Sequence, residues 1–335
     1  MKAFQLSLLC IFTAVSVLAQ EPAITPSDSG ASITLEDKSA KEEDMAKVSL
    51  DDGALQPEAP TEQGSEMLDP SKRAEVVQKA QEETGDVEKL RALSVEDRRK
   101  VTEMLQEASE FVMGIRVQEA FERLVKVEAI APDLFALHNL KGAAYTKIRD
   151  FEKARESFEK AVSMAPRSFM AKFNLNELDF VSGANKERSK KGAGLPDLQK
   201  AAEGFEALGK QLRADVLDLE QAQINANAAN DLQKANLYEL RIAATSDTIR
   251  LMDYKVLICH LLLGNEGDVQ RILDTFHFMD DVPAFYYSNA SIAFHADDEE
   301  QAQDWIRQAK SIYDKSQNDI YIDSLVEIGW IDSFQ

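Results

Sequence analysis

The side chains best suited to chemistry are imidazoles and carboxylates near the C-terminal end of the chain. The run His295-Ala-Asp-Asp-Glu-Glu300 follows His277 and the pair Asp280-Asp281. Together these groups resemble the nitrogen and oxygen ligands that divalent cations use in proteins. The same carboxylates, however, fit the turn and first turn of a helix, where they cap exposed amides and favour the helix dipole. We expect this second role, and hence no metal site and no cofactor.

The rest of the sequence offers no catalytic constellation. The other histidines, His138 and His260, stand far from these groups and from each other without metal-ligand spacing. No glycine-rich phosphate loop, no nucleophile elbow and no paired-cysteine motif is present. Cys259 lies in the apolar stretch 254–263, where a thiol acts as a small buried hydrophobe. The sequence therefore predicts a protein that is not an enzyme.

Residues 135–166 predict two amphipathic helices joined by a short turn. The first carries apolar side chains at three- and four-residue spacing, from Leu137 to Ile148, and contains Gly142. Because glycine in a helix costs about 1 kcal/mol relative to alanine, we expect a neighbouring helix to approach closely there. The second helix carries Ala154, Phe158 and Ala161 on one face, and Pro166 ends it.

These positions recur at a period of 34 residues. Ala120, Leu124 and Pro132 return as Ala154, Phe158 and Pro166, and Ala108 and Phe111 return as Gly142 and Tyr145. The small slot of successive second helices continues along the chain as Ala201, Ala235, Val269 and Ala302. A helical period of this length is typical of solenoid repeats.

In residue type and spacing, Gly142, Tyr145, Ala154, Phe158, Ala161 and Pro166 resemble the tetratricopeptide repeat (TPR). The resemblance implies an all-α fold, an α-solenoid of about six helix-turn-helix units over residues 98–316. The third unit is longer by 13 residues, and we place the extra residues in a loop over 182–196 that contains glycine, serine and proline. This loop is basic (Lys186, Arg188, Lys190 and Lys191) and is either a docking element for an acidic partner or a solvated loop.

The two ends of the chain differ from the repeats. Residues 1–19 resemble a secretory signal peptide cleaved after Ala19, with an apolar run too short to span a bilayer comfortably. Residues 20–70 form an acidic linker without aromatic residues, with 13 Asp and Glu against three Lys from residue 21 onward, which predicts disorder. Residues 71–97 form a short helical segment, ending in a possible capping box at Ser94. Residues 317–335 form a C-terminal capping helix and tail that cover the last unit.

In TPR proteins, the first helices of successive units line the concave face, where peptides or helices dock. Members that grip acidic tails use Lys and Asn there, types that Asn139 and Lys147 match while the other clamp residues have no counterpart. Phe173 and Phe180, seven residues apart, are expected either as an exposed apolar anchor or as packing for the next unit. The full predicted lining is Leu105, Val112, Met113, Asn139, Thr146, Lys147, Phe173, Glu177, Phe180, Tyr287, Phe294 and His295.

The formal net charge of −21 disfavours nucleic acid and anionic membrane surfaces as partners. The sequence predicts an exported adaptor or scaffold, periplasmic or secreted, that binds a protein or peptide without catalysis. The main alternative is a self-associating structural subunit of an envelope assembly or secretion machine. A third possibility is an accessory module for a small molecule or glycan.

Overall fold

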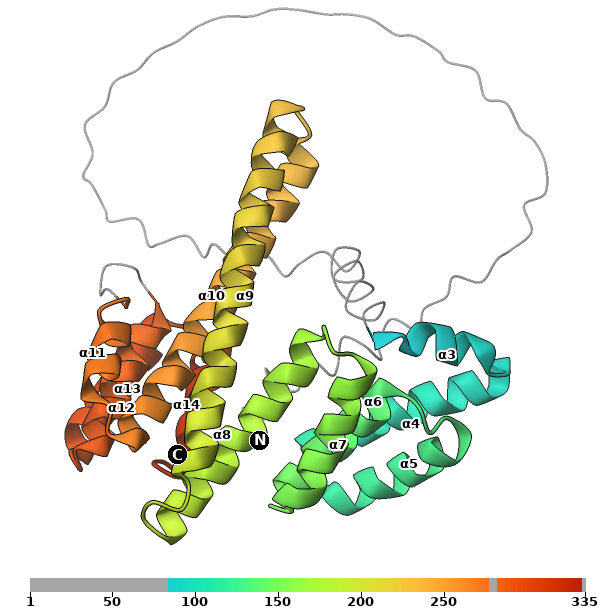
Figure 1. Cartoon of the computed structure of the whole chain (residues 1–335). Coiled ribbons are helices and arrows are strands. Elements are labelled where there is room, and N and C mark those ends of the chain that lie inside the picture. The colour runs from blue at the N-terminus through green and yellow to red at the C-terminus, as the bar shows by residue number, and fades with distance from the viewer. Residues whose placement is uncertain (1–83, 277–281, 333–335) are drawn as a thin grey trace, which may run out of the picture.

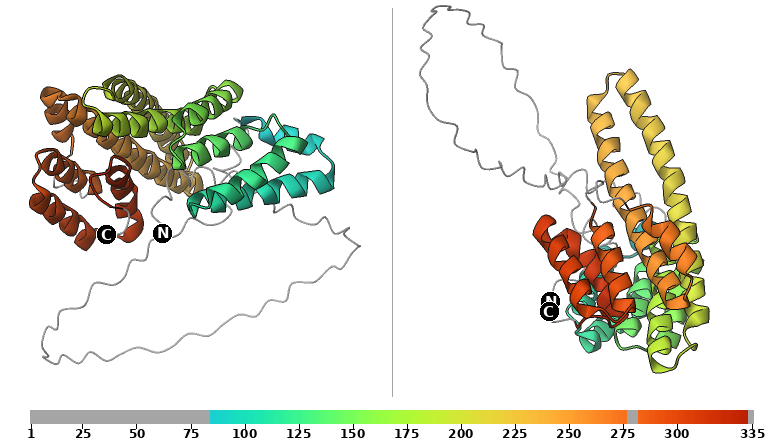
Figure 2. Two further views of the ribbon diagram at one scale, coloured as in Figure 1. Left: turned by 90° about the horizontal axis from the view of Figure 1, so that it is seen from below. Right: turned by 90° about the vertical axis from the view of Figure 1, so that its left-hand side faces the viewer.

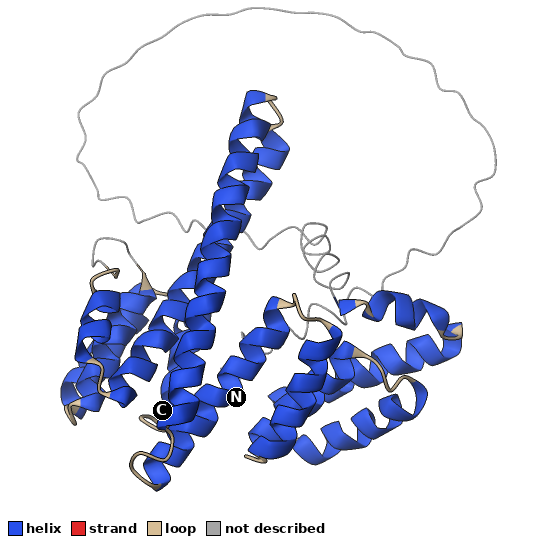
Figure 3. Ribbon diagram, viewed as in Figure 1, coloured by secondary structure: helices blue, strands red, loops and turns tan. Residues whose placement is uncertain are grey.

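The computed structural model describes residues 84–276 and 282–332, and within these ranges the chain is entirely helical (Figures 1 and 3). The twelve helices are α3 (Asp86–Ala92), α4 (Val95–Met113), α5 (Val117–Ile130), α6 (Phe135–Lys147), α7 (Phe151–Met164), α8 (Phe169–Ser189), α9 (Leu195–Ala228), α10 (Leu232–Leu263), α11 (Glu266–Leu273), α12 (Pro283–His295), α13 (Glu299–Ile312) and α14 (Lys315–Glu327).

Consecutive helices pack in antiparallel pairs, as the repeat period predicts. The pairs are α4–α5, α6–α7, α8 with the first half of α9, the second half of α10 with α11, and α12–α13. The first helices also contact one another along the array, α4 with α6, α6 with α8, and α10 with α12. The chain therefore forms an all-α, TPR-like solenoid, and we call the side made by α4, α6, α8, α12 and the second half of α10 the inner face.

The α6–α7 pair shows why the repeat residues stand where they do. A Cβ atom placed on Gly142 would lie 2.5 Å from the ring of Phe158, so only glycine allows α7 to approach this closely. Ala154 and Ala161, the small slots of α7, are fully buried. The predicted close contact at Gly142 is confirmed.

Apolar side chains form two large cores. One core joins α3, α4, α5 and α6 with the ends of α7 and α8, and the other joins α8 to α14. A small cluster of Ala154, Phe158 and Leu178 lies between α7 and α8. Figure 1 shows the corresponding two lobes, with α8 between them.

The main departure from a regular array is a long helical hairpin. The expected fourth unit is present as a helical pair, but its two helices are not separate elements. Its first helix is the second half of α9, which has 34 residues, and its second helix is the first half of α10, which has 32 residues. The two helices extend well beyond the rest of the molecule (Figures 1 and 2). Neither helix contains a glycine or proline beyond Gly209 that would end it early, which explains the continuity.

The prediction of a basic loop over 182–196 is wrong for most of its length. Helix α8 runs to Ser189 and α9 begins at Leu195, so only five residues connect them. Gly183, which suggested a turn, lies inside α8 where a Cβ would come 2.9 Å from the backbone nitrogen of Leu198. The glycine serves a close crossing of α8 and α9, and Ser182 and Lys186 both bond to Asp197 across it.

At the ends of the array, Ser94 caps α4 by accepting a hydrogen bond from the amide of Asp97, and its hydroxyl donates to the Asp97 carboxylate; the cap is confirmed, but not the reciprocal bond of the predicted capping box. Asp314 and Gln317 form a capping box at the start of α14. The predicted signal peptide, the acidic linker and residues 71–83 lie outside the described residues. Among the described helices, none combines the length and apolar character needed to cross a membrane.

Candidate functional site

The predicted inner-face residues of the first two units are mostly internal. Leu105 and Val112 are buried in the first core, and Met113 packs against it half-buried. The Asn139 side-chain oxygen accepts a 2.8 Å hydrogen bond from Asn174, which links α6 to α8. Thr146 donates to the carbonyl of Gly142 within α6. These five side chains stabilise the array and do not form an open lining.

Phe173 and Phe180 are not an exposed anchor. They are 5 % and 0 % exposed, and both rings contact Phe205 of α9, with centroids 5.9 and 6.3 Å apart. The exposed reading of these residues is therefore wrong: both rings pack against α9, the second helix of their own pair. Their seven-residue spacing identified a shared face but not the helix that covers it.

The remaining lining residues face α14, the last described helix, or Trp330 just after it. Tyr287 stacks on Tyr321 of α14, with ring centroids 5.4 Å apart, and donates a 2.8 Å hydrogen bond to Asn318. Phe294 stacks on Trp330 at 6.0 Å, and His295, which is exposed, lies 6.4 Å from the same ring. The segment that was expected to cap the last unit thus also contacts α8 and α10 on the inner face.

A buried ionic cluster lies under the C-terminal half of α14. Lys255 of α10 is 3 % exposed, and its Nζ donates to Glu177 of α8 at 2.8 Å and to Ser324 of α14 at 2.9 Å. It also lies 3.5 Å from the carboxyl group of Glu327 and 4.8 Å from the ring centre of Phe180. Burial opposes the charge of Lys255, but Glu177 and Glu327 outweigh it and raise the pKa of the lysine.

Lys147 of α6 and Asp323 of α14 complete the cluster. Burial lowers the pKa of Lys147 to about 7, against the opposing charges of Glu327, Asp323 and Glu177. Burial raises the pKa of Asp323 to about 8, and burial together with the charge of Glu177 raises that of Glu327. Groups from four helices therefore share one partly desolvated site, whose charge state changes near neutral pH.

Sequence reasoning identified Lys147 and Glu177 but missed Lys255, Asp323 and Glu327. A signal for Lys255 exists, because it is the single charge in the otherwise apolar stretch 254–263. A lysine in such a helix needs a buried partner. No comparable signal marks Asp323 and Glu327, which lie in a sequence segment far from the helices they contact.

The basic residues of α8 and its connection have different surroundings. Arg188 donates a 3.0 Å hydrogen bond to the carbonyl of Ile328, at the end of α14, and Lys186 pairs with Asp197 at 2.5 Å. Lys190 and Lys191 are exposed. Two of the four residues therefore have structural contacts, and two remain as a small basic surface whose role in docking stays a prediction.

The distal half of the hairpin, residues 213–249, is the most open part of the described structure. Only Ala226 and Ala235 are buried there. Leu217, Ile224, Leu232 and Leu240 are 66, 60, 62 and 44 % exposed. The two distal helices pack on each other and on no third helix (Figure 2), so these large apolar groups face solvent.

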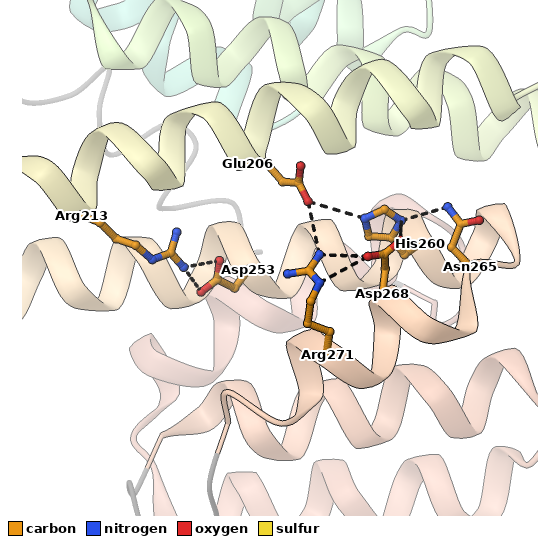
Figure 4. Close-up of polar contacts among 7 residues, drawn as sticks. All are labelled: Glu206, Arg213, Asp253, His260, Asn265, Asp268 and Arg271. Atoms are coloured by element: carbon orange, nitrogen blue, oxygen red, sulfur yellow. Dashed lines mark hydrogen bonds and ion pairs between the residues drawn. The ribbon is translucent and has the colours of Figure 1, made fainter.

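Polar contacts fix the base of this hairpin (Figure 4). Arg213 of α9 bonds both carboxylate oxygens of Asp253 at 2.6 and 2.5 Å. Two turns before Arg213 on α9, Glu206 lies 3.7 Å from both His260 and Arg271. Arg271 also bonds Asp268 at 3.1 Å. The network joins α9, α10 and α11, and we infer that it fixes the direction in which the hairpin leaves the array.

The residues that the sequence analysis considered as candidates for metal binding or reactivity have structural roles here. Asp298 caps α13 by accepting from the amide of Gln301, which confirms the capping role expected for this acidic run. Cys259 is a free, fully buried thiol whose pKa is raised by burial, as the apolar stretch predicts. In the described ranges no three His, Cys, Asp or Glu side chains are grouped to hold a metal ion. His277, Asp280 and Asp281 lie outside those ranges.

Comparison with known proteins adds one finding. Residues 135–168, which form α6, α7 and the turn that follows, match the family model of the tetratricopeptide repeat. Searches of curated proteins and of solved structures give no significant match. Since tetratricopeptide repeats generally mediate contacts between proteins, the match and the paired helices together support a protein-interaction scaffold with a TPR-like solenoid fold.

Proposed function

We propose that this chain is an exported, non-catalytic scaffold of the bacterial envelope, periplasmic or secreted, that binds a protein partner through the distal half of the α9–α10 hairpin. The observation that carries the proposal is the group of large, exposed apolar side chains on two helices that no third described helix contacts. Leu217 and Ile224 are seven residues apart and lie on one side of α9. Apolar side chains that a monomer leaves exposed as a group are typical of protein contact surfaces.

The test is a chemical crosslinking pull-down from envelope extract with the full chain as bait. The test variant is Leu217→Asp with Ile224→Asp, and the matched control is Val95→Asp with Ile312→Asp, which changes two equally exposed apolar residues outside the hairpin. We expect one protein to be captured by the wild type and the control and to be lost with the hairpin variant. Equal capture by all three baits would contradict the hairpin as the binding surface.

The second candidate is self-association, which the same exposed residues favour. In that case the wild type crosslinks to its own copies, and purified protein forms oligomers whose mass falls to that of a monomer in the Leu217→Asp, Ile224→Asp variant. Light scattering on the purified chain separates this outcome from binding to a different protein.

A further inference from the structure

The inner face carries a binding site for a helix, and the chain fills this site with its own α14. Residues of α14 and just after it contact three helices of the array directly: α8 through Glu177 and Arg188, α10 through Lys255, and α12 through Tyr287 and Phe294. Lys147 of α6 interacts with the charges of Asp323 and Glu327. A helix that only capped the last unit would need contacts with α12 and α13 alone.

The contacts divide α14 into two parts of different chemistry. Its first half packs Tyr321 between Tyr287 and Tyr254, whose ring centres lie 5.4 and 5.1 Å away. Its second half brings the carboxyl groups of Asp323 and Glu327, four residues apart and therefore on one side of the helix, toward two lysines. Leu325, between them, is fully buried.

The array side of this site carries two lysines, Lys255 and Lys147, and one carboxyl group, that of Glu177. Lys255 and Lys147 come from separate first helices and are held in place by packing, with Phe180 under the Lys255 ammonium group. In a partly desolvated position, two lysines favour acidic side chains and reject basic ones. The occupant that fits is a helix with an aromatic residue followed by two carboxyl side chains four residues apart.

We propose that α14 is an intramolecular ligand of the inner face, and that an acidic helix of a partner protein with this pattern binds the same site when α14 leaves it. The connection from α13 to α14 is only Tyr313 and Asp314, and α12 and α13 pack directly on each other without α14 between them. This inference rests on the proposed scaffold function, but it concerns a different surface from the hairpin.

The covalent connection to α13 explains why α14 occupies the site in preference to a free helix of the same sequence. A segment joined through a two-residue connection faces its site at an effective concentration on the order of mM. A free helix of the same sequence at µM concentration therefore does not compete until the resident contacts are weakened. Charge reversal of Asp323 and Glu327 weakens them, because it places cations opposite Lys147 and Lys255.

The test uses a fluorescent peptide of residues 313–332 and the full chain, with binding measured by fluorescence anisotropy. The test variant carries Asp323→Lys and Glu327→Lys. The control carries Glu299→Lys and Glu300→Lys, which make the same change of charge on exposed residues of α13. We expect the peptide to bind the test variant at least 10-fold more tightly than the wild type or the control. A peptide with the same two lysine substitutions should lose that binding.

Equal affinity of the peptide for all three proteins would overturn the proposal, and so would failure to bind a test variant that keeps its helical circular dichroism. If the lysine variant unfolds, Asp323→Asn with Glu327→Gln replaces it, with a smaller gain in affinity expected and the same contradicting outcomes. The hairpin variant Leu217→Asp, Ile224→Asp keeps α14 intact and should give no gain. Equal capture by all three baits in the pull-down, together with a positive peptide result, contradicts only the proposed hairpin function. Capture that is lost with the hairpin variant, together with a negative peptide result, contradicts only this inference.

Discussion

The α6–α7 pair and the distal half of the α9–α10 hairpin are both antiparallel helical pairs, yet they are stabilised in different ways. In α6–α7, Gly142 and Phe158 fit against each other, and α5 and α8 cover the two sides of the pair. In the distal hairpin, only Ala226 and Ala235 are buried, and no third helix within the described ranges adds a layer. A repeat unit depends on its neighbours for most of its buried area, so a pair without neighbours keeps its apolar groups available for another molecule.

The largest expected difference comes from truncating one large apolar side chain in each region. Phe158→Ala should lower the free energy of unfolding by about 3–5 kcal/mol, because it removes a buried ring from between two layers. Leu217→Ala, at a position 66 % exposed, should change it by less than about 0.5 kcal/mol. Urea unfolding followed by circular dichroism measures both. Similar losses for the two variants would show that the distal hairpin is covered.

Replacing a glycine by alanine in each of two helices gives the next largest effect on the free energy of unfolding. Gly142→Ala should cost about 1–3 kcal/mol because its Cβ would lie 2.5 Å from Phe158. Gly267→Ala, in α11 with no atom within 4 Å of the added Cβ, should be neutral or stabilise by up to about 1 kcal/mol. Thermal unfolding of the two variants provides the comparison. If Gly142→Ala were harmless, the close contact of α6 with α7 would not be what restricts this position.

These two regions also show what could be predicted from the sequence. The small slots of α7 and the role of Gly142 follow from spacing alone, because a 34-residue period places the same contacts in each unit. The continuity of α9 and α10 could have been recognised, since residues 210–263 contain neither glycine nor proline. The loop predicted over 182–196 failed because Gly183 permits a helix crossing, and composition does not distinguish that use from a turn.

The inner face was predictable in its residues but not in its occupant. The TPR resemblance led to Lys147, Glu177, Tyr287 and Phe294, which the structure brings toward one helix. That this helix is α14 depends on contacts between segments separated by as many as 140 residues, such as Arg188 with Ile328. Periodicity describes neighbours along the chain and carries no information on such distant pairs.

A third region, α14, sharpens the comparison. Its neighbours are helices of the inner face, and its contribution to stability depends on pH. The charged groups that face Asp323 come from four helices: Lys147, Glu177, Lys255, Asp319 and Glu327. Since the pKa of Asp323 rises from 3.8 to about 8 on folding, the folded state binds the proton more tightly. The stabilising contribution is complete below about pH 4 and is lost as the pH rises toward 8.

We therefore expect the free energy of unfolding to depend on pH through Asp323 between about pH 4 and pH 7. Its contribution falls by at most about 1.4 kcal/mol for each pH unit. Lys147 has a folded-state pKa of about 7, so its contribution to the free energy of unfolding changes only above that pH. There it rises with pH, opposite to the contribution of Asp323, because the unfolded state binds more protons. Urea unfolding at pH 4.5, 5.5 and 6.5 should show a smaller slope for Asp323→Asn than for the wild type. The exposed control Asp332→Asn should keep the wild-type slope, and an unchanged slope in Asp323→Asn would contradict this account.

The smallest effect is expected at the base of the hairpin. Arg213→Met removes the bidentate contact with Asp253 and should cost at most about 1 kcal/mol, because the pair is partly exposed. Hydrogen–deuterium exchange should increase in the distal hairpin and stay unchanged in α6–α7. Faster exchange in α6–α7 as well would show that the contact stabilises the whole array and does not act locally on the hairpin.

The most direct test of the central claim, that no third helix among the described residues packs on the distal hairpin, is hydrogen–deuterium exchange of the full wild-type protein at low concentration. We predict that amides of residues 213–249 exchange through low-energy local opening, at least 100-fold faster relative to their intrinsic rates than those of α6 and α7. Protection of the two regions to the same degree, unchanged on further dilution, would contradict the claim, because it would mean that another part of the chain covers the hairpin.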